Sequence, residues 1–187
     1  MKTTISHSLG QPLAAIATAI LLAGCAKEAP LAPNSHATVP AQFAASRSAE
    51  KDDAIGTLKR VTARYHDLNA AIADGFVFLH GCEVRSDEGP VGTVYVHMGR
   101  LLDGVIDPSL PDGLIYEPRK NGHPKLLGVE FAVPYPLWTK QAPPNFLGVP
   151  FQREDEFGVF GLHVWTWTNN PEGLFAESNP NVACGEE

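Results

Sequence analysis

The chain has 187 residues, with 14 Lys and Arg against 21 Asp and Glu, so its formal net charge at pH 7 is −7. This length suits a single domain that can bury a core without a structural metal ion. The acidic balance argues against a nucleic-acid partner, because phosphate binding calls for clustered Lys and Arg. The sequence also has no basic cluster of the kind that holds anionic lipid headgroups.

The N-terminus has the features of a bacterial export signal. Lys2 is the only charged residue ahead of an apolar run, 13–23, that reads LAAIATAILLA. The run is too short for a transmembrane helix, which needs about 20 apolar residues, but it suits the core of a signal peptide. It ends in Leu22-Ala23-Gly24-Cys25, which resembles the lipobox of bacterial lipoprotein precursors. That resemblance implies a signal peptide over 1–24 and a lipid anchor of diacylglycerol and palmitate on Cys25.

The residues after Cys25 bear on where the protein resides. Ala26, in place of Asp, implies by the same resemblance the outer membrane of the cell envelope, with the protein facing the periplasm. The alternative is that Cys25 is an ordinary thiol after a conventional signal peptide. Residues 25–52 are rich in Ala, Pro and Ser without a repeating period, which predicts a flexible tether. Residues 53–187 would then form a single globular domain.

Two more cysteines, Cys82 and Cys184, remain after Cys25 is assigned to the lipid. In an oxidising compartment, a pair of cysteines is most simply a disulfide bond. The bond would close a loop of about a hundred residues, which the chain-entropy model values at roughly 4 kcal/mol. A two-thiolate metal site is the alternative, although no Cys-x-x-Cys spacing supports it.

The first element of the domain is predicted to be an amphipathic helix. Asp52 or Asp53 can cap its start, and Gly75 can end it. Apolar residues recur every three or four positions between these limits, which places them on one face of a helix. They are Ile55, Leu58, Val61, Tyr65, Leu68 and Ile72.

The rest of the domain is predicted to be antiparallel strands. Short runs of Val, Phe, Tyr and Trp alternate with turns such as Pro111-Asp112-Gly113, and no second long helix is indicated. The predicted strands lie near 76–80, 92–99, 114–117, 126–134, 146–151 and 157–168. The fold class is therefore α+β, with one N-terminal helix packed on a curled antiparallel sheet or small β-barrel.

Four ionisable residues stand in these strands among large apolar neighbours: His97, Glu117, Glu130 and His163. Burying a charged group is costly unless it is paired or binds a metal. If the sheet closes, the four side chains could converge as ligands for zinc, iron or manganese, or act as general acid and base. A period of two places Tyr95 beside His97, and Trp165 with Trp167 beside His163, as pocket walls. The alternative is that all four are polar residues on a solvated sheet face.

The stretch from Tyr95 to Cys184 resembles a family of uncharacterised exported bacterial proteins, a resemblance that implies no mechanism. It rests on His97-Met98-Gly99, Leu114-Ile115-Tyr116-Glu117-Pro118, Gly128-Val129-Glu130-Phe131, His163-Val164-Trp165-Thr166-Trp167 and Asn179-Pro180-Asn181-Val182-Ala183-Cys184.

Two functional hypotheses follow. The preferred one is a membrane-anchored envelope lipoprotein whose exported domain binds a small ligand or a partner protein. The other is a metal-binding pocket, either catalytic or metal-carrying, built from His97, Glu117, Glu130 and His163. The sequence identifies no reaction, so it does not decide whether the protein is an enzyme, and it does not indicate an oligomeric state.

Overall fold

The computed structural model describes residues 41–85 and 89–185, which belong to one compact unit, Val39–Glu187. The predicted signal peptide, Cys25 and the first part of the predicted tether lie outside the described residues. Within the described part, no helix combines the length and apolar character needed to cross a membrane.

The helical segment begins earlier than predicted. α1 spans Ala41–Thr62, so the tether predicted for 25–52 is helical from Ala41 onward. Its first turns are rich in Ala, Gln, Arg, Glu and Lys, which have high helix propensity. Side chains at 46–53 are exposed, so this part of the helix forms without packing on the sheet.

The helical segment is also broken where the sequence predicted continuity. α1 passes into the 3-10 helix η1 (Ala63–His66), and α2 spans only Leu68–Ala73. Between them Asp67 is extended, and its carboxylate accepts a hydrogen bond from the Asn69 amide at 3.0 Å, which caps α2. Gly75 follows α2 with φ +100°, a conformation that favours glycine.

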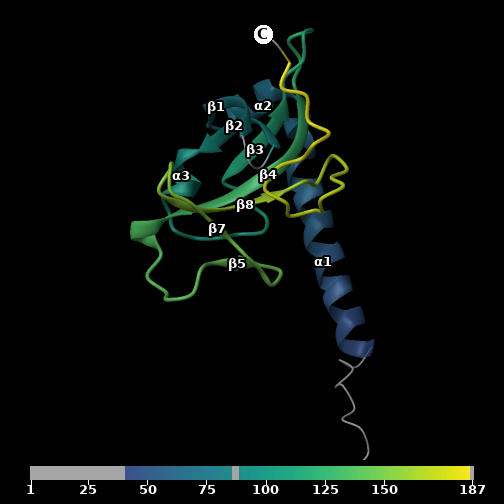
Figure 1. Cartoon of the computed structure of the whole chain (residues 1–187), viewed down its shortest axis with the longest axis vertical. Helices are drawn as coiled ribbons and strands as arrows, with labels where there is room; N and C mark the ends of the chain where they lie inside the picture. Colours follow the sequence, from purple (N-terminus) through teal and green to yellow (C-terminus); the bar gives the residue numbers. More distant parts are fainter. Residues whose placement is uncertain (1–40, 86–88, 186–187) are drawn as a thin grey trace, which may run out of the picture. The chain divides into compact units, whose positions relative to one another are not determined.

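The strands confirm an antiparallel α+β fold, in which a curled sheet forms a half-barrel (Figure 1). Six strands form one sheet in the order β1-β2-β3-β4-β8-β7, while β5 and β6 pair with each other. Their bounds are β1 Phe76–Arg85, β2 Gly89–His97, β3 Gly113–Glu117, β4 Lys125–Pro134, β5 Asn145–Phe146, β6 Val149–Pro150, β7 Gln152–Glu154 and β8 Val159–Val164. Short helices α3 (Met98–Leu101) and η2 (Tyr135–Leu137) follow β2 and β4.

The sheet buries apolar side chains on both faces, which we call the helix face and the tail face. On the helix face, Leu58 of α1 packs with Leu114 and Tyr116 of β3. On the tail face, Ile115 of β3 packs with Trp165 and Val182. Successive residues of β3 therefore enter different clusters, as the alternation of a strand requires.

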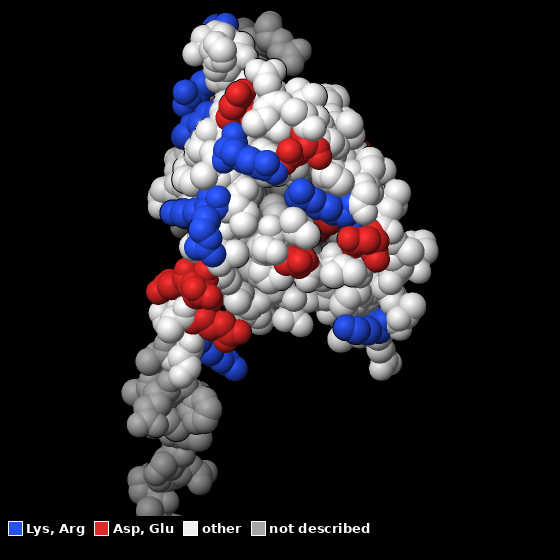
Figure 2. Space-filling model, turned by 180° about the vertical axis from the view of Figure 1, so that it is seen from behind, with Lys and Arg blue, Asp and Glu red and all other residues white. Residues whose placement is uncertain are grey.

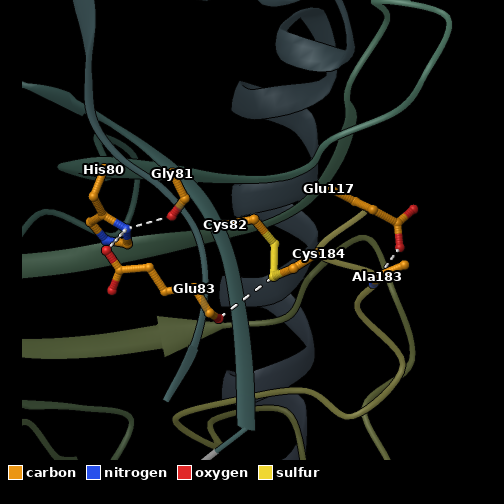
Figure 3. Close-up of a disulfide and its surroundings, with 7 residues drawn as sticks. All are labelled: His80, Gly81, Cys82, Glu83, Glu117, Ala183 and Cys184. Atoms are coloured by element: carbon orange, nitrogen blue, oxygen red, sulfur yellow. Dashed lines mark hydrogen bonds and ion pairs between the residues drawn. A yellow bond between two sulfur atoms is a disulfide. The ribbon is translucent and has the colours of Figure 1, made fainter. Parts of the chain in front are cut away.

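The C-terminal tail, which comprises the described residues after Val164, covers part of the tail face and is held there by the predicted disulfide. Cys82 of β1 and Cys184, 102 residues apart in sequence, are joined with an S–S distance of 2.03 Å (Figure 3). Nearby, the backbone amide of Asn179 donates to the Pro90 carbonyl oxygen at 3.0 Å. The tail is thus fixed both covalently and by hydrogen bonds.

Charged side chains of both signs are interspersed on the face shown in Figure 2, and most of that surface is uncharged. Among the residues that this view describes, no broad basic area is formed.

Candidate functional site

The structure brings together two of the four predicted site residues. Glu130 of β4 and His163 of β8 are direct partners across the two strands. Both line the same small cavity on the tail face, which we call the Glu130 pocket. The pairing arises because polar residues at matching positions of neighbouring antiparallel strands project from the same face.

The other two predicted residues lie elsewhere. His97, at the end of β2, packs against Phe76 on the helix face, with ring centroids 5.5 Å apart, and its Nδ1 accepts from the Arg100 amide. Glu117 is on the tail face but at the far end of β3, where its Oε1 accepts from the Ala183 amide at 3.2 Å. Figure 3 shows Glu117 directed toward Ala183 beside the disulfide.

The predicted convergence of all four residues is therefore wrong. Alternation along β2 sends His97 to the face opposite Glu130. In β3 it is Gly113 that pairs with Glu130, whereas Glu117 pairs with Lys125. Within the described part of the chain, no group of three or more His, Cys, Asp or Glu is arranged to hold a metal ion.

The predicted pocket walls also need correction. Tyr95 packs against Phe78 and Tyr116 on the helix face. Trp165 is close to the pocket, with its ring 6.0 Å from that of His163, but it belongs to the buried tail-face cluster. Trp167 does not line the pocket. β8 ends at Val164, and beyond it the indole ring turns toward α1, where its Nε1 donates to the Thr62 hydroxyl at 3.0 Å.

The Glu130 pocket has a volume of about 120 Å³. Its wall is mainly apolar, with two carboxylates and two imidazoles as its ionisable groups. Among the described residues that line it, none is Lys or Arg. The lining consists of Leu79, His80, Val96, Leu101, Glu130, Ala132, Glu154, Phe157, Val159 and His163. The rings of His80 and Phe157 stack at 5.5 Å with an interplanar angle of 18°.

Glycines on the two strands beside β4 make room for the Glu130 side chain. A Cβ atom placed on Gly113 of β3 would lie 2.9 Å from both Cβ and Oε2 of Glu130. A Cβ atom placed on Gly161 of β8 would lie 3.6 Å from Oε1 of Glu130. The carboxylate therefore lies over positions where the neighbouring strands carry no side chain.

Burial raises the pKa of Glu130 to about 7. The electrostatic interaction with His163 lowers this pKa, whereas the nearby carboxylates of Glu177, Glu154 and Asp112 raise it further. Glu130 is therefore poised between its neutral and charged forms near neutral pH.

His163 is 5% exposed and is held in one orientation by the C-terminal tail. Its Nδ1 lies 2.6 Å from the carbonyl oxygen of Glu177. Because a carbonyl oxygen only accepts hydrogen bonds, this contact assigns a proton to Nδ1. In the neutral ring, Nε2 is then an acceptor.

Sequence reasoning missed a second buried carboxylate, Asp112, which it assigned to a turn. Asp112 is 1% exposed, and its Oδ2 accepts from the amide of Ala132, a residue of the pocket wall, at 2.9 Å. Among the described residues its Oδ1 finds no hydrogen-bond partner, and burial raises the pKa of this carboxyl to about 7. Only burial distinguishes this aspartate from an ordinary turn residue, and burial depends on the tertiary structure.

His80 and Glu154 were also missed as pocket residues. β1 has a register shift between Phe78 and His80, so the simple alternation of that strand does not predict where His80 points. Glu154 ends β7, a three-residue strand that the sequence does not separate from the turn after it.

Comparison of the chain with protein-family models, with curated proteins and with solved structures finds no match. The pocket and the N-terminal sequence are therefore the features that indicate a function.

Proposed function

We propose that this protein is a lipid-anchored envelope lipoprotein whose exported domain binds a small ligand in the Glu130 pocket. The observation that carries the proposal is the pairing of Glu130 and His163 inside a cavity whose wall is otherwise mainly apolar. Ligand sites commonly combine an apolar wall with a few polar groups that orient the ligand.

The burial of the Glu130 carboxyl group supports this proposal. A buried polar group without a hydrogen bond costs free energy, and a charged one costs more. Burial raises the pKa of Glu130 to about 7, so ionising its carboxyl group at the cavity wall costs free energy in the described structure. A ligand that bonds to the carboxyl would recover part of that free energy.

The disulfide and the N-terminal sequence support the cellular location. Disulfides persist in oxidising compartments such as the periplasm, so Cys82–Cys184 favours export. The resemblance of 22–25 to a lipobox supports anchoring through Cys25, and by the same resemblance Ala26 supports the outer membrane.

Lipidation can be tested by growing bacteria that express the full chain with labelled palmitate. The wild-type protein should carry the label, and Cys25→Ala should not. The matched control is the Cys82→Ser, Cys184→Ser double variant, which lacks the other two cysteines and should stay labelled. An unlabelled wild type, or a labelled Cys25→Ala variant, would contradict the proposed anchor.

Ligand binding can be tested with the full-length protein in a mild detergent, by screening a library of small fragments for increased thermal stability. Leu79 lines the pocket and is 40% exposed, so Leu79→Trp should block the entrance. Phe78, 58% exposed, does not line the pocket, so Phe78→Trp is the matched control. Fragments should stabilise the wild type and the control but not Leu79→Trp.

Two results would go against the small-ligand proposal. One is a fragment set that stabilises Leu79→Trp as well as it stabilises the wild type, and the other is an absence of any stabilising fragment. Zinc, iron and manganese belong in the same screen, because the sequence also raised a metal site. A stoichiometric metal that Glu130→Gln removes would replace the small-ligand proposal with the metal-binding one.

A further inference from the structure

We infer that the ligand of the Glu130 pocket is a small organic cation, a protonated amine with a compact apolar body. The inference rests on the proposed ligand-binding function and adds the chemical class of the ligand. It follows from the charges around the pocket, the hydrogen-bond donors available there and the nature of the wall.

The charges around the pocket favour a cation. Glu130 and Glu154 line the cavity, and the carboxylates of Glu177 and Asp112 lie near enough to act on Glu130. No Lys or Arg stands among the described residues of the lining, and the only basic groups there are the imidazoles of His80 and His163. An anionic ligand would meet several carboxylates in a mainly apolar site, where like charges repel more strongly than in bulk water.

The hydrogen bonds around the pocket favour a donor. Both imidazoles direct Nδ1 to a backbone carbonyl, His163 to Glu177 at 2.6 Å and His80 to Gly81 at 2.9 Å. Neither of those protons is therefore available to Glu130. An ammonium group supplies three donors and a positive charge, whereas a carboxylate only accepts. Charge-assisted hydrogen bonds of this type are stronger than neutral ones.

The wall and size of the pocket define the rest of the ligand. Leu79, Val96, Leu101 and Val159 present an aliphatic surface, which suits an alkyl body. Phe157, stacked with His80, adds an aromatic ring, whose face also attracts cations. A volume of about 120 Å³ restricts the ligand to one small ring or a short alkyl chain.

Binding of an amine should be linked to release of a proton from Glu130. The pKa of Glu130 is about 7, so the carboxyl is partly protonated at neutral pH, while an alkylamine, like the lysine side chain, stays protonated up to roughly pH 10. The groups that face Glu130 are His163 of β8, Glu154 of β7, Glu177 of the tail and Asp112 before β3. Because the ammonium group selects the charged carboxylate, its affinity should rise about tenfold from pH 6 to pH 8.

The test is isothermal titration calorimetry on the full-length protein in a mild detergent, with three probes of similar shape. The probes are cyclohexylamine, cyclohexanol and cyclohexanecarboxylate. Measurements at pH 7 in two buffers with different ionisation enthalpies report the proton released. Glu130→Gln keeps the size of the side chain but removes its charge. Glu156→Gln removes a charge from an exposed residue outside the lining and serves as the matched control.

The inference predicts that cyclohexylamine binds at least tenfold more tightly than the other two probes and releases protons at pH 7. Glu130→Gln should weaken amine binding at least tenfold, and Glu156→Gln should leave it unchanged. Equal binding of cyclohexanol, or unchanged amine binding by Glu130→Gln, would overturn the cation inference while leaving a ligand pocket in place. If none of the probes binds, the inference fails, and the Leu79→Trp screen then decides separately whether the pocket binds anything.

Discussion

Glu130→Gln is expected to stabilise the fold above neutral pH, although it replaces a residue within the sheet. Burial raises the pKa of Glu130 from 4.5 to about 7, so the folded state holds this proton more tightly than the unfolded state does. The resulting contribution to stability is fully present below pH 4.5 and is lost as the pH rises to about 7. The difference between the two pKa values corresponds to a loss on the order of 3 kcal/mol. Gln does not ionise and avoids this loss.

Urea unfolding of the full-length protein at pH 5, 6, 7 and 8, with the disulfide intact, measures the effect. The free energy of unfolding of Glu130→Gln should exceed that of the wild type by about 1 kcal/mol at pH 5 and by roughly 3 kcal/mol at pH 8. Asp112, whose pKa is also raised by burial, should leave part of the pH dependence in place. Glu156→Gln controls for the loss of one negative charge. A stability difference that does not grow with pH would refute the reasoning.

Two further predictions concern the sheet and the disulfide. Gly128→Ala should lower the free energy of unfolding by more than about 2 kcal/mol, because its Cβ would lie 2.5 Å from the Val164 carbonyl oxygen. Gly56→Ala in α1, where a Cβ meets nothing within 4 Å, should raise it by about 0.5–1 kcal/mol, and similar effects of the two substitutions would contradict this account. Removing the disulfide with Cys82→Ser should cost about 4 kcal/mol in urea unfolding, and an unchanged midpoint would show that the tail is held mainly by other contacts.

Much of the sheet could be predicted from the sequence because its strands alternate and its turns carry Gly, Pro and Asp. β4 is an example, since the predicted 126–134 closely matches Lys125–Pro134. The features of the sheet that could not be predicted depend on how neighbouring strands pair. Leu127 enters the tail-face cluster although strict alternation would place it on the same face as Val129, because the register between β3 and β4 shifts at this point.

The candidate site could be predicted only in part for the same reason. Glu130 and His163 stand out as ionisable residues amid apolar strands, and matching positions on β4 and β8 bring them together. His97 and Glu117 are also ionisable residues amid apolar strands. His97 lies on the opposite face of the sheet from Glu130, and Glu117 lies at the far end of its strand. Those two properties depend on register and sheet order, which a single sequence does not contain.

The most direct test of the account follows the carboxyl carbon of Glu130 by ¹³C NMR while cyclohexylamine is added at pH 7. The Glu130→Gln variant identifies the resonance by its absence. The account predicts that the resonance moves toward the position of the ionised carboxylate and saturates at one amine per protein. A resonance that stays in place through the titration would contradict the claim that Glu130 receives the ligand.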